Sequence, residues 1–217
     1  MDESLARTRF NARLSETLDP MLHKFGFTGS GKHFRRQIGE ILHCVTVQGH
    51  SRGGRSTINL GIHPVFLPGL EDTPVDPETI LEVDCEFRNM LHPSMRGDHW
   101  WDYQTLFSRP ERQALDMVKT FRKAGEPFLK SFSDVDAILE DLPFRRLQAN
   151  RVDNCRLGLA GYCTRGRGCL TIARIHTYRG NHDQARRFAA LGLEHVGSQT
   201  PIAESLRDIL NSNEVGS

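Results

Sequence analysis

The sequence predicts an α+β fold, with an N-terminal helix packed on an antiparallel β-meander and a helical C-terminal part after it. Two changes in the spacing of apolar residues predict this order, because helices repeat about every 3.6 residues and strands about every two. The helical spacing ends near residue 25, a strand-like alternation fills residues 27–68, and the helical spacing returns after residue 110. We therefore expect an α+β sheet domain over residues 1–130 and a helical region over residues 131–217 that docks on it.

The first 25 residues are typical of an amphipathic helix. Arg, Asn and Glu separate the apolar positions, so one side of the helix is apolar and packs on another element. Pro20 predicts either a kink or the start of a second short helix at Asp19. Gly26 suits the left-handed residue that ends many helices. The apolar stripe consists of Leu5, Phe10, Leu14, Leu18, Met21, Leu22 and Phe25.

Three short strands follow, joined by short links. Residues 28–31 form a turn, the Gly39–Glu40 pair a hairpin link, and residues 50–55 a polar, glycine-rich loop. Such strands make an antiparallel meander, with one face on the N-terminal helix and the other a candidate open face. The strands are predicted over residues 33–38, 41–48 and 56–63.

Prolines then mark an irregular connection, and a further strand is predicted over residues 80–90, whose first part could instead be a short helix. Residues 97–102 form a polar and aromatic turn. On the strand, Asp84 and Glu86 would share one solvated face, because strand side chains alternate. Helices are predicted over residues 110–130, 135–142, 169–178, 182–195 and 200–210, the first with the stripe Leu115, Val118, Phe121, Ala124 and Phe128.

Charge and composition narrow the class of function. The 28 basic and 27 acidic residues give a net charge of +1, which argues against a dedicated nucleic-acid binder. No stretch approaches the roughly 18–20 apolar residues of a membrane helix, and the N-terminus is not a signal peptide. An odd number of cysteines, five, favours free thiols in a reducing compartment. We expect a cytoplasmic protein without a cofactor.

One cysteine pattern invites comparison with a metal site. Cys155, Cys163, Cys169 and His176 resemble the middle of a CCCH zinc finger, which supplies four soft or imidazole ligands. The family's histidine position holds Ala173, however, and His176 comes one helical turn later. Small buried residues explain the cysteines better, so no metal is predicted, although zinc binding stays open.

The segment Asp98-His99-Trp100-Trp101-Asp102 allows three interpretations. A histidine between two carboxylates could act as a general base, but adjacent residues seldom point into one pocket. The tryptophan pair could anchor the loop to the core or contact a partner. No nucleophile elbow, zinc-protease motif, P-loop or dinucleotide motif accompanies it.

Taken together, several segments resemble a bacterial family of unknown function over about residues 14–130. Its members begin with a helix, followed by a G-F…F-x-R strand and an N-L-G-I strand, with a later arginine and tryptophan pair. The resemblance implies the same α+β fold and no activity. The matching positions are Leu22, Gly26, Phe27, Gly31, Phe34, Arg36, Gln48, Ser51, Asn59, Leu60, Gly61, Ile62, Arg88, Trp100 and Trp101.

Residues 173–196 resemble a tetratricopeptide-type helical hairpin. A single repeat cannot stack into a solenoid, which needs about three. The hairpin therefore docks on the sheet domain or forms half of a protein-binding groove.

These observations favour a non-catalytic binding protein, in the manner of an immunity or antitoxin-like protein that neutralises a bacterial toxin. Its predicted binding residues are Trp100, Trp101, His99, Asp98, Arg88, Gln48 and Arg36. The alternative is an enzyme of unrecognised type that acts on a small polar substrate at the sheet face, through Arg36, Gln48, His50, Asn59, Glu86, Arg88 and His99. A weaker hypothesis is RNA binding through Arg165, Arg167, Arg174 and Arg179.

Overall fold

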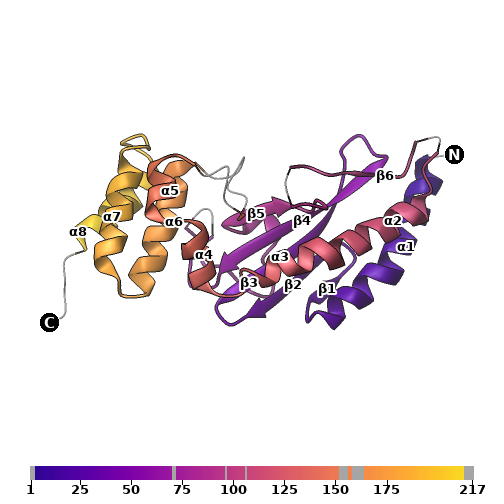
Figure 1. The fold of residues 1–217 in the computed structure, drawn as a ribbon, viewed down its shortest axis with the longest axis horizontal. Helices are drawn as coiled ribbons and strands as arrows, with labels where there is room; N and C mark the ends of the chain where they lie inside the picture. The colour runs from indigo at the N-terminus through magenta and orange to yellow at the C-terminus, as the bar shows by residue number, and fades with distance from the viewer. Residues whose placement is uncertain are drawn as a thin grey trace.

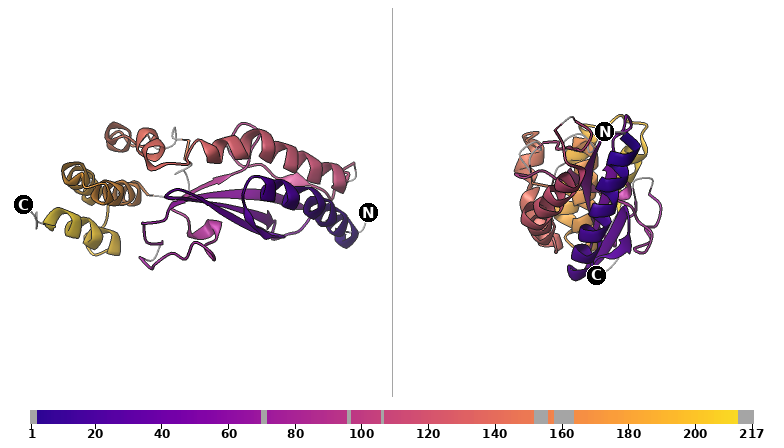
Figure 2. Two further views of the ribbon diagram at one scale, coloured as in Figure 1. Left: turned by 90° about the horizontal axis from the view of Figure 1, so that it is seen from below. Right: turned by 90° about the vertical axis from the view of Figure 1, so that its right-hand side faces the viewer.

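The computed structural model describes residues 3–69, 72–95, 97–105, 107–151, 156–157 and 164–212. It has the predicted α+β architecture, with the sheet and two long helices at one end and the C-terminal helices at the other (Figure 1). The first and last helices, α1 (Glu3–Lys24) and α8 (Pro201–Asn211), lie at opposite ends of this elongated molecule (Figure 2).

Helix α1 (Glu3–Lys24) packs against the sheet through apolar residues at every fourth position. Pro20 lies inside this helix, so no second helix begins at Asp19. Gly26 follows with φ +81°, the left-handed conformation expected of a helix-ending glycine. Leu5, predicted in the apolar stripe, is instead 52% exposed. The buried residues are Ala6, Phe10, Leu14, Leu18 and Leu22.

The sheet is the predicted antiparallel meander. Strands β1 to β5 lie side by side in chain order. The short β6 pairs with the first residues of β4, and β5 pairs with later residues of the same strand. All pairings are antiparallel. The strands are β1 (Thr28–Ser30), β2 (His33–Ile38), β3 (Ile41–Gly49), β4 (Arg55–Pro64), β5 (Phe87–Met90) and β6 (Trp101–Asp102).

The structure settles or corrects several local predictions. Thr28–Ser30, predicted as a turn, is a strand, and the turn comes one step later, at residues 31–32. Of the two possibilities left open for the first part of residues 80–90, the short helix is correct, since the 3-10 helix η1 (Glu82–Asp84) precedes a strand that begins only at Phe87. Asp84 and Glu86 therefore do not share a strand face. The turn predicted over residues 97–102 ends in strand β6.

The two faces of the sheet are covered differently. On one face, Ile58, Leu60 and Ile62 of β4 join the main core with α1 and α2. On the other, Leu42 and Cys44 of β3 pack against Ile80 and Cys85 of the loop between β4 and β5. That second face is thus partly covered.

A long helical segment lies beside α1 on the sheet (Figure 1). It comprises α2 (Pro110–Thr120), a π-helical turn η2 (Phe121–Gly125) and α3 (Glu126–Lys130), which together fill the predicted helix. α1 and α2 run in the same direction, since Arg9 pairs with Glu111 near one end, while Arg36 bonds both the Phe25 carbonyl and Glu126 at the other.

The C-terminal region is helical, as predicted. Helix α6 begins four residues before the predicted Cys169, because the Thr164 side chain caps it by accepting a hydrogen bond from the Arg167 amide. Asp134, Asn181 and Thr200 cap other helices in the same way. The helices are α4 (Val135–Asp141), the unpredicted α5 (Phe144–Gln148), α6 (Arg165–Tyr178), α7 (His182–Leu193) and α8 (Pro201–Asn211).

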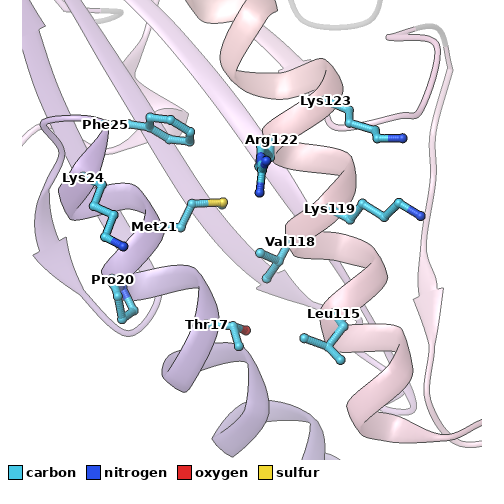
Figure 3. A pocket seen from close by; sticks show the side chains of 10 residues that line it. All are labelled: Thr17, Pro20, Met21, Lys24, Phe25, Leu115, Val118, Lys119, Arg122 and Lys123. Atoms are coloured by element: carbon cyan, nitrogen blue, oxygen red, sulfur yellow. The ribbon is translucent and has the colours of Figure 1, made fainter.

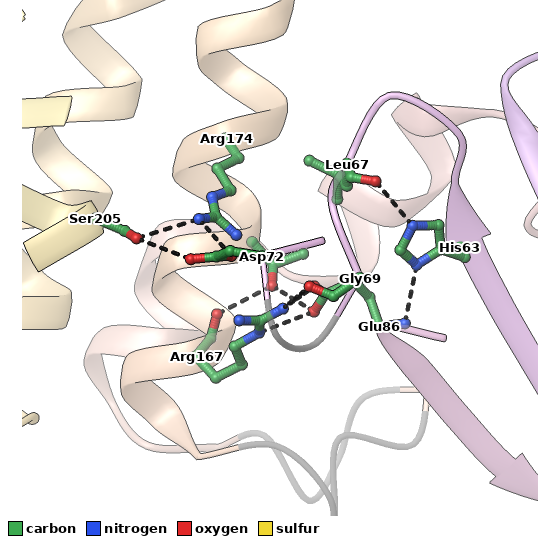
Figure 4. A network of polar contacts seen from close by, with 9 residues as sticks. His63, Leu67, Gly69, Asp72, Glu86, Arg167, Arg174 and Ser205 are labelled. Carbon is green, nitrogen blue, oxygen red and sulfur yellow. Dashed lines mark hydrogen bonds and ion pairs between the residues drawn. The ribbon is translucent and has the colours of Figure 1, made fainter. Parts of the chain in front are cut away.

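A buried ion pair joins these helices to the sheet. Arg167 of α6 bonds both carboxylate oxygens of Glu86, and the Thr171 hydroxyl donates to the same carboxylate (Figure 4). The Glu86 amide donates in turn to Nδ1 of the buried His63, whose Nε2 lies 3.1 Å from the Leu67 carbonyl.

None of the helices in the described ranges has both the length and the apolar character needed to cross a bilayer.

Candidate functional site

A distinctive surface of the described residues lies between α1 and α2, on the side turned away from the sheet. Each helix presents residues there at positions i, i+3, i+4, i+7 and i+8, the spacing of a single helix face. We call the hollow between these two faces the docking groove (Figure 3). Its lining residues are Thr17, Pro20, Met21, Lys24 and Phe25 of the first segment and Leu115, Val118, Lys119, Arg122 and Lys123 of the second.

The floor of the docking groove is apolar and reachable from solvent. It is an open hollow of about 790 Å³, in which Met21 and Val118 point toward the space between the helices (Figure 3). Leu115 is 40% exposed, while Met21, Phe25 and Val118 are half-buried. Grouped apolar side chains on a surface commonly mark an interaction site. Methionine suits such a site because its flexible thioether adapts to different partners.

The rim of the docking groove is basic. Lys24, Lys119, Arg122 and Lys123 line it, and no carboxylate does. Within the described part of the chain, none of these four cations has a carboxylate partner within ion-pair distance. Three of the five lysines of a nearly neutral chain are thus concentrated here. An apolar floor beneath unpaired cations favours an occupant that is both apolar and acidic.

The seven residues that the sequence analysis proposed as a binding site do not come together. Arg36 is buried on the helix-covered face of the sheet, where it pairs with Glu126 at 2.9 Å and lies over the Phe27 ring. On the opposite face, Arg88 pairs with Glu82, and Gln48 accepts a hydrogen bond from Asn59. These contacts hold the sheet together.

The tryptophans divide between core and surface. Trp101 is 1% exposed, and its indole N–H donates to Asp116 of α2 at 2.9 Å, so it anchors the loop to the core, which is one of the two roles considered for the tryptophan pair. Trp100 is half-buried beside the imidazole ring of His50 and the guanidinium of Arg55.

The remaining two residues flank the tryptophans. His99 packs edge-on against the Trp101 ring, and burial, with a contribution from His92, lowers the pKa of the His99 imidazole. Asp98 is exposed.

The residues of the catalytic alternative come together only in part. Gln48, Asn59 and Arg88 are linked by hydrogen bonds around Glu82 on one face of the sheet. Arg36 lies on the other face, and Glu86 is engaged by Arg167. Burial raises the pKa of the Glu82 carboxyl, which Arg88 and Asn59 partly oppose by hydrogen bonds. Structural ion pairs perturb pKa values in the same way as active sites do, so this shift alone does not identify a catalytic acid.

The zinc candidate is only half described. Cys155 and Cys163 lie outside the described residues. Burial raises the pKa of the Cys169 thiol to about 12, and His176 stacks on the Phe188 ring. Among the residues that the structure describes, no three histidine, cysteine or acidic side chains gather as metal ligands.

The arginines proposed for RNA binding are occupied within the chain. Arg167 pairs with Glu86, Arg174 with Asp72 and Arg179 with Asp136. Arg165 donates to the Gln148 carbonyl. This cluster therefore serves to connect segments of the fold.

Sequence reasoning missed the docking groove because it placed Leu115 and Val118 in one apolar stripe with Phe121, Ala124 and Phe128. Phe121 and Phe128 do face the core, but Leu115 and Val118 face the groove. A signal was available in the sequence, since lysine or arginine follows apolar residues at helical spacing in both segments.

Comparison with known proteins places the chain in a family. The family described as Domain of unknown function (DUF4304) matches residues 18–131, which is more than half of the chain, so the chain belongs to that family. The matched range contains every lining residue of the docking groove except Thr17, which immediately precedes it. No curated protein and no solved structure was found to match the chain.

Proposed function

We propose that this DUF4304 protein is a non-catalytic binding protein that holds an acidic protein partner in the docking groove. One observation carries the proposal: an open apolar hollow is rimmed by four cations that have no carboxylate partner in the described chain. Holding these cations together without counter-charges costs free energy through mutual repulsion. An acidic partner would relieve that repulsion and cover the apolar floor in the same step.

The finer form of the proposal is an immunity or antitoxin-like role, in which the partner is a bacterial toxin. Opposite charge on the two partners would speed their encounter, which suits a protein that must neutralise a toxin quickly. The proposal places the encounter in the cytoplasm, in keeping with the free thiols of Cys44, Cys85 and Cys169.

The test is affinity capture from the native host with the wild-type chain and with Leu115→Asp, followed by identification of the bound proteins. The substitution puts a carboxylate into the apolar floor beside the basic rim, where it would repel an acidic partner. We expect one stoichiometric acidic partner to be retained by the wild type and lost with Leu115→Asp. Co-expression should then show whether the chain suppresses the toxicity of that partner.

Leu5→Asp is the matched control, because Leu5 is an exposed leucine of α1 outside the docking groove. This variant should capture the partner as well as the wild type does. A partner that binds Leu115→Asp and wild type equally would show that the docking groove is not the binding site.

A further inference from the structure

We infer that the docking groove takes a two-turn amphipathic α-helix of the partner, with apolar side chains at i, i+3 or i+4, and i+7 and carboxylates along the flank that lies beside α2. This inference rests on the proposed function and specifies the structural element that the partner presents. It follows from the length of the groove, from the backbone chemistry of its walls and from the uneven placement of its cations.

The length of the docking groove fits two helical turns. Its lining runs from Thr17 to Phe25 along one wall and from Leu115 to Lys123 along the other. At about 1.5 Å per residue, eight steps along a helix span about 12 Å. Two turns of a bound helix cover about 11 Å, which places three anchoring side chains along the floor.

The walls favour a helix over an extended strand. Both walls are formed by the side chains of helices, whose own backbone groups are bonded within the helix. A bound strand would face these walls with unpaired N–H and C=O groups, which is costly on an apolar floor. A helix satisfies its backbone internally and can offer the floor only side chains.

The cations are distributed unevenly across the docking groove. Lys24 is the single cation on the α1 wall, whereas α2 and η2 contribute Lys119, Arg122 and Lys123. Lys119 and Lys123 point to the outer side of α2, and Arg122 points into the space between the helices (Figure 3). We therefore expect most carboxylates of the partner helix on the flank beside α2.

A concave site favours a helix over an anionic membrane surface. The apolar side chains line the space between two parallel helices, and cations stand on both sides of it (Figure 3). A flat bilayer surface would contact the rim while leaving much of the floor uncovered. Binding to anionic vesicles is accordingly the competing outcome in the test.

The test uses the full chain with isotope-labelled methionine methyl groups, observed by NMR. Met21 lies in the docking groove, and Met117 is a fully buried residue of α2 on the core side. The probe is a synthetic 15-residue helical peptide with leucines at positions 4, 8 and 11 and glutamates on one flank. A peptide of the same composition with its leucines at positions 4, 6 and 8, and a peptide with lysine for glutamate, serve as controls.

We expect the acidic helical peptide to shift the Met21 signal and to leave Met117 in place. The respaced peptide, the lysine peptide and the Leu115→Asp variant should each weaken binding at least tenfold, whereas Leu5→Asp should not. No shift at Met21, or equal binding of the respaced peptide, would overturn the inference. A Met21 shift seen only with phosphatidylserine vesicles would overturn it in favour of a membrane surface.

The same experiment separates this inference from the proposed function. If the captured partner requires Leu115 but the acidic peptide neither binds nor competes with that partner, the proposed function stands and the helical mode fails. If no partner depends on Leu115, the proposed function fails on its own test.

Discussion

Two helical segments of this protein carry a row of basic residues, and the two rows differ in whether their charges have partners within the chain. Along α6 and its C-cap, Arg167, Arg174 and Arg179 form ion pairs with carboxylates elsewhere in the chain, and Arg167 is buried with Glu86. Along α2 and η2, Lys119, Arg122 and Lys123 lie at the surface without such partners in the described chain. The contrast shows that basic residues indicate an external partner only where the fold leaves their charges uncompensated.

Of the changes that test this contrast, we expect the largest loss of stability from breaking the ion pair of α6. Replacing Arg167 with methionine leaves the Glu86 carboxylate buried without its main partner, and breaking a buried pair costs about 3–5 kcal/mol. We expect Arg167→Met to lower the free energy of unfolding by about that amount, as measured by urea denaturation. Lys119→Met is the control on α2 and should stay within about 0.5 kcal/mol of the wild type.

Similar losses from Arg167→Met and Lys119→Met would contradict the comparison. The double variant Glu86→Leu with Arg167→Met should recover part of the loss, because no unpaired charge remains buried.

Acid should destabilise the folded protein through His43, which is buried beside Arg36. This imidazole lies beside the buried Arg36, and burial lowers its pKa from 6.5 to about 4. The unfolded chain therefore takes up a proton near pH 6.5, which the folded chain accepts only near pH 4. Stability is lost as the pH falls through this window, by about 3 kcal/mol in total.

Denaturation series between pH 7 and 4 would measure this loss. A His43→Gln variant keeps an acceptor for Arg36 and a donor for the Phe132 carbonyl, so it should show a smaller fall over the same range. An identical fall in both proteins would assign the acid sensitivity to other groups, such as His63, whose pKa burial also lowers.

A smaller effect sharpens the comparison on α2 itself. Leu115 is 40% exposed, whereas Met117, two residues away, is fully buried. Leu115→Ala should lower the free energy of unfolding by less than about 1 kcal/mol, and Met117→Ala by about 2–5 kcal/mol. Urea denaturation of both variants is the measurement, and equal losses would place Leu115 in the core rather than in a docking surface.

The smallest expected effect has the opposite sign. Lys119 and Lys123 point to the same side of α2, so each repels the other (Figure 3). Lys123→Glu should raise the free energy of unfolding by about 0.2–0.5 kcal/mol, because it replaces repulsion by attraction. The same variant should bind the acidic partner more weakly, especially at low salt, where exposed charges are least screened.

The sequence predicted the elements better than it predicted the site. Period changes placed α1, the meander and the C-terminal helices because burial on one face imposes a repeat on the sequence. The period left open whether a helix precedes β5, since Cys85 is held by a contact with Gly61 of β4 that is distant in sequence. Gly61 records that contact, because a side chain there would meet Cys85.

The candidate site was harder to predict because its residues look like core and surface residues in a single chain. Leu115 and Val118 continue the helical period of the core residues, and only packing reveals that they face outward. The sequence left open whether Trp101 anchors the loop or contacts a partner, because its bond to Asp116 depends on where α2 lies. Pairing between distant residues, such as Arg167 and Glu86, decides which charges stay free.

The π-helical turn η2 sets how α2 and α3, two parts of one continuous helix, are rotated relative to each other. Before it, α2 directs Leu115 and Val118 outward, and after it, Glu126 of α3 points inward to Arg36. A π-helical turn holds one residue more than an α-helix of the same course, and one residue corresponds to about 100° of rotation. Deleting a single residue from η2 would therefore leave an α-helix of the same course, so that the buried ion pair and the outward stripe could keep their places, whereas deleting two would turn one half by about 100° against the other.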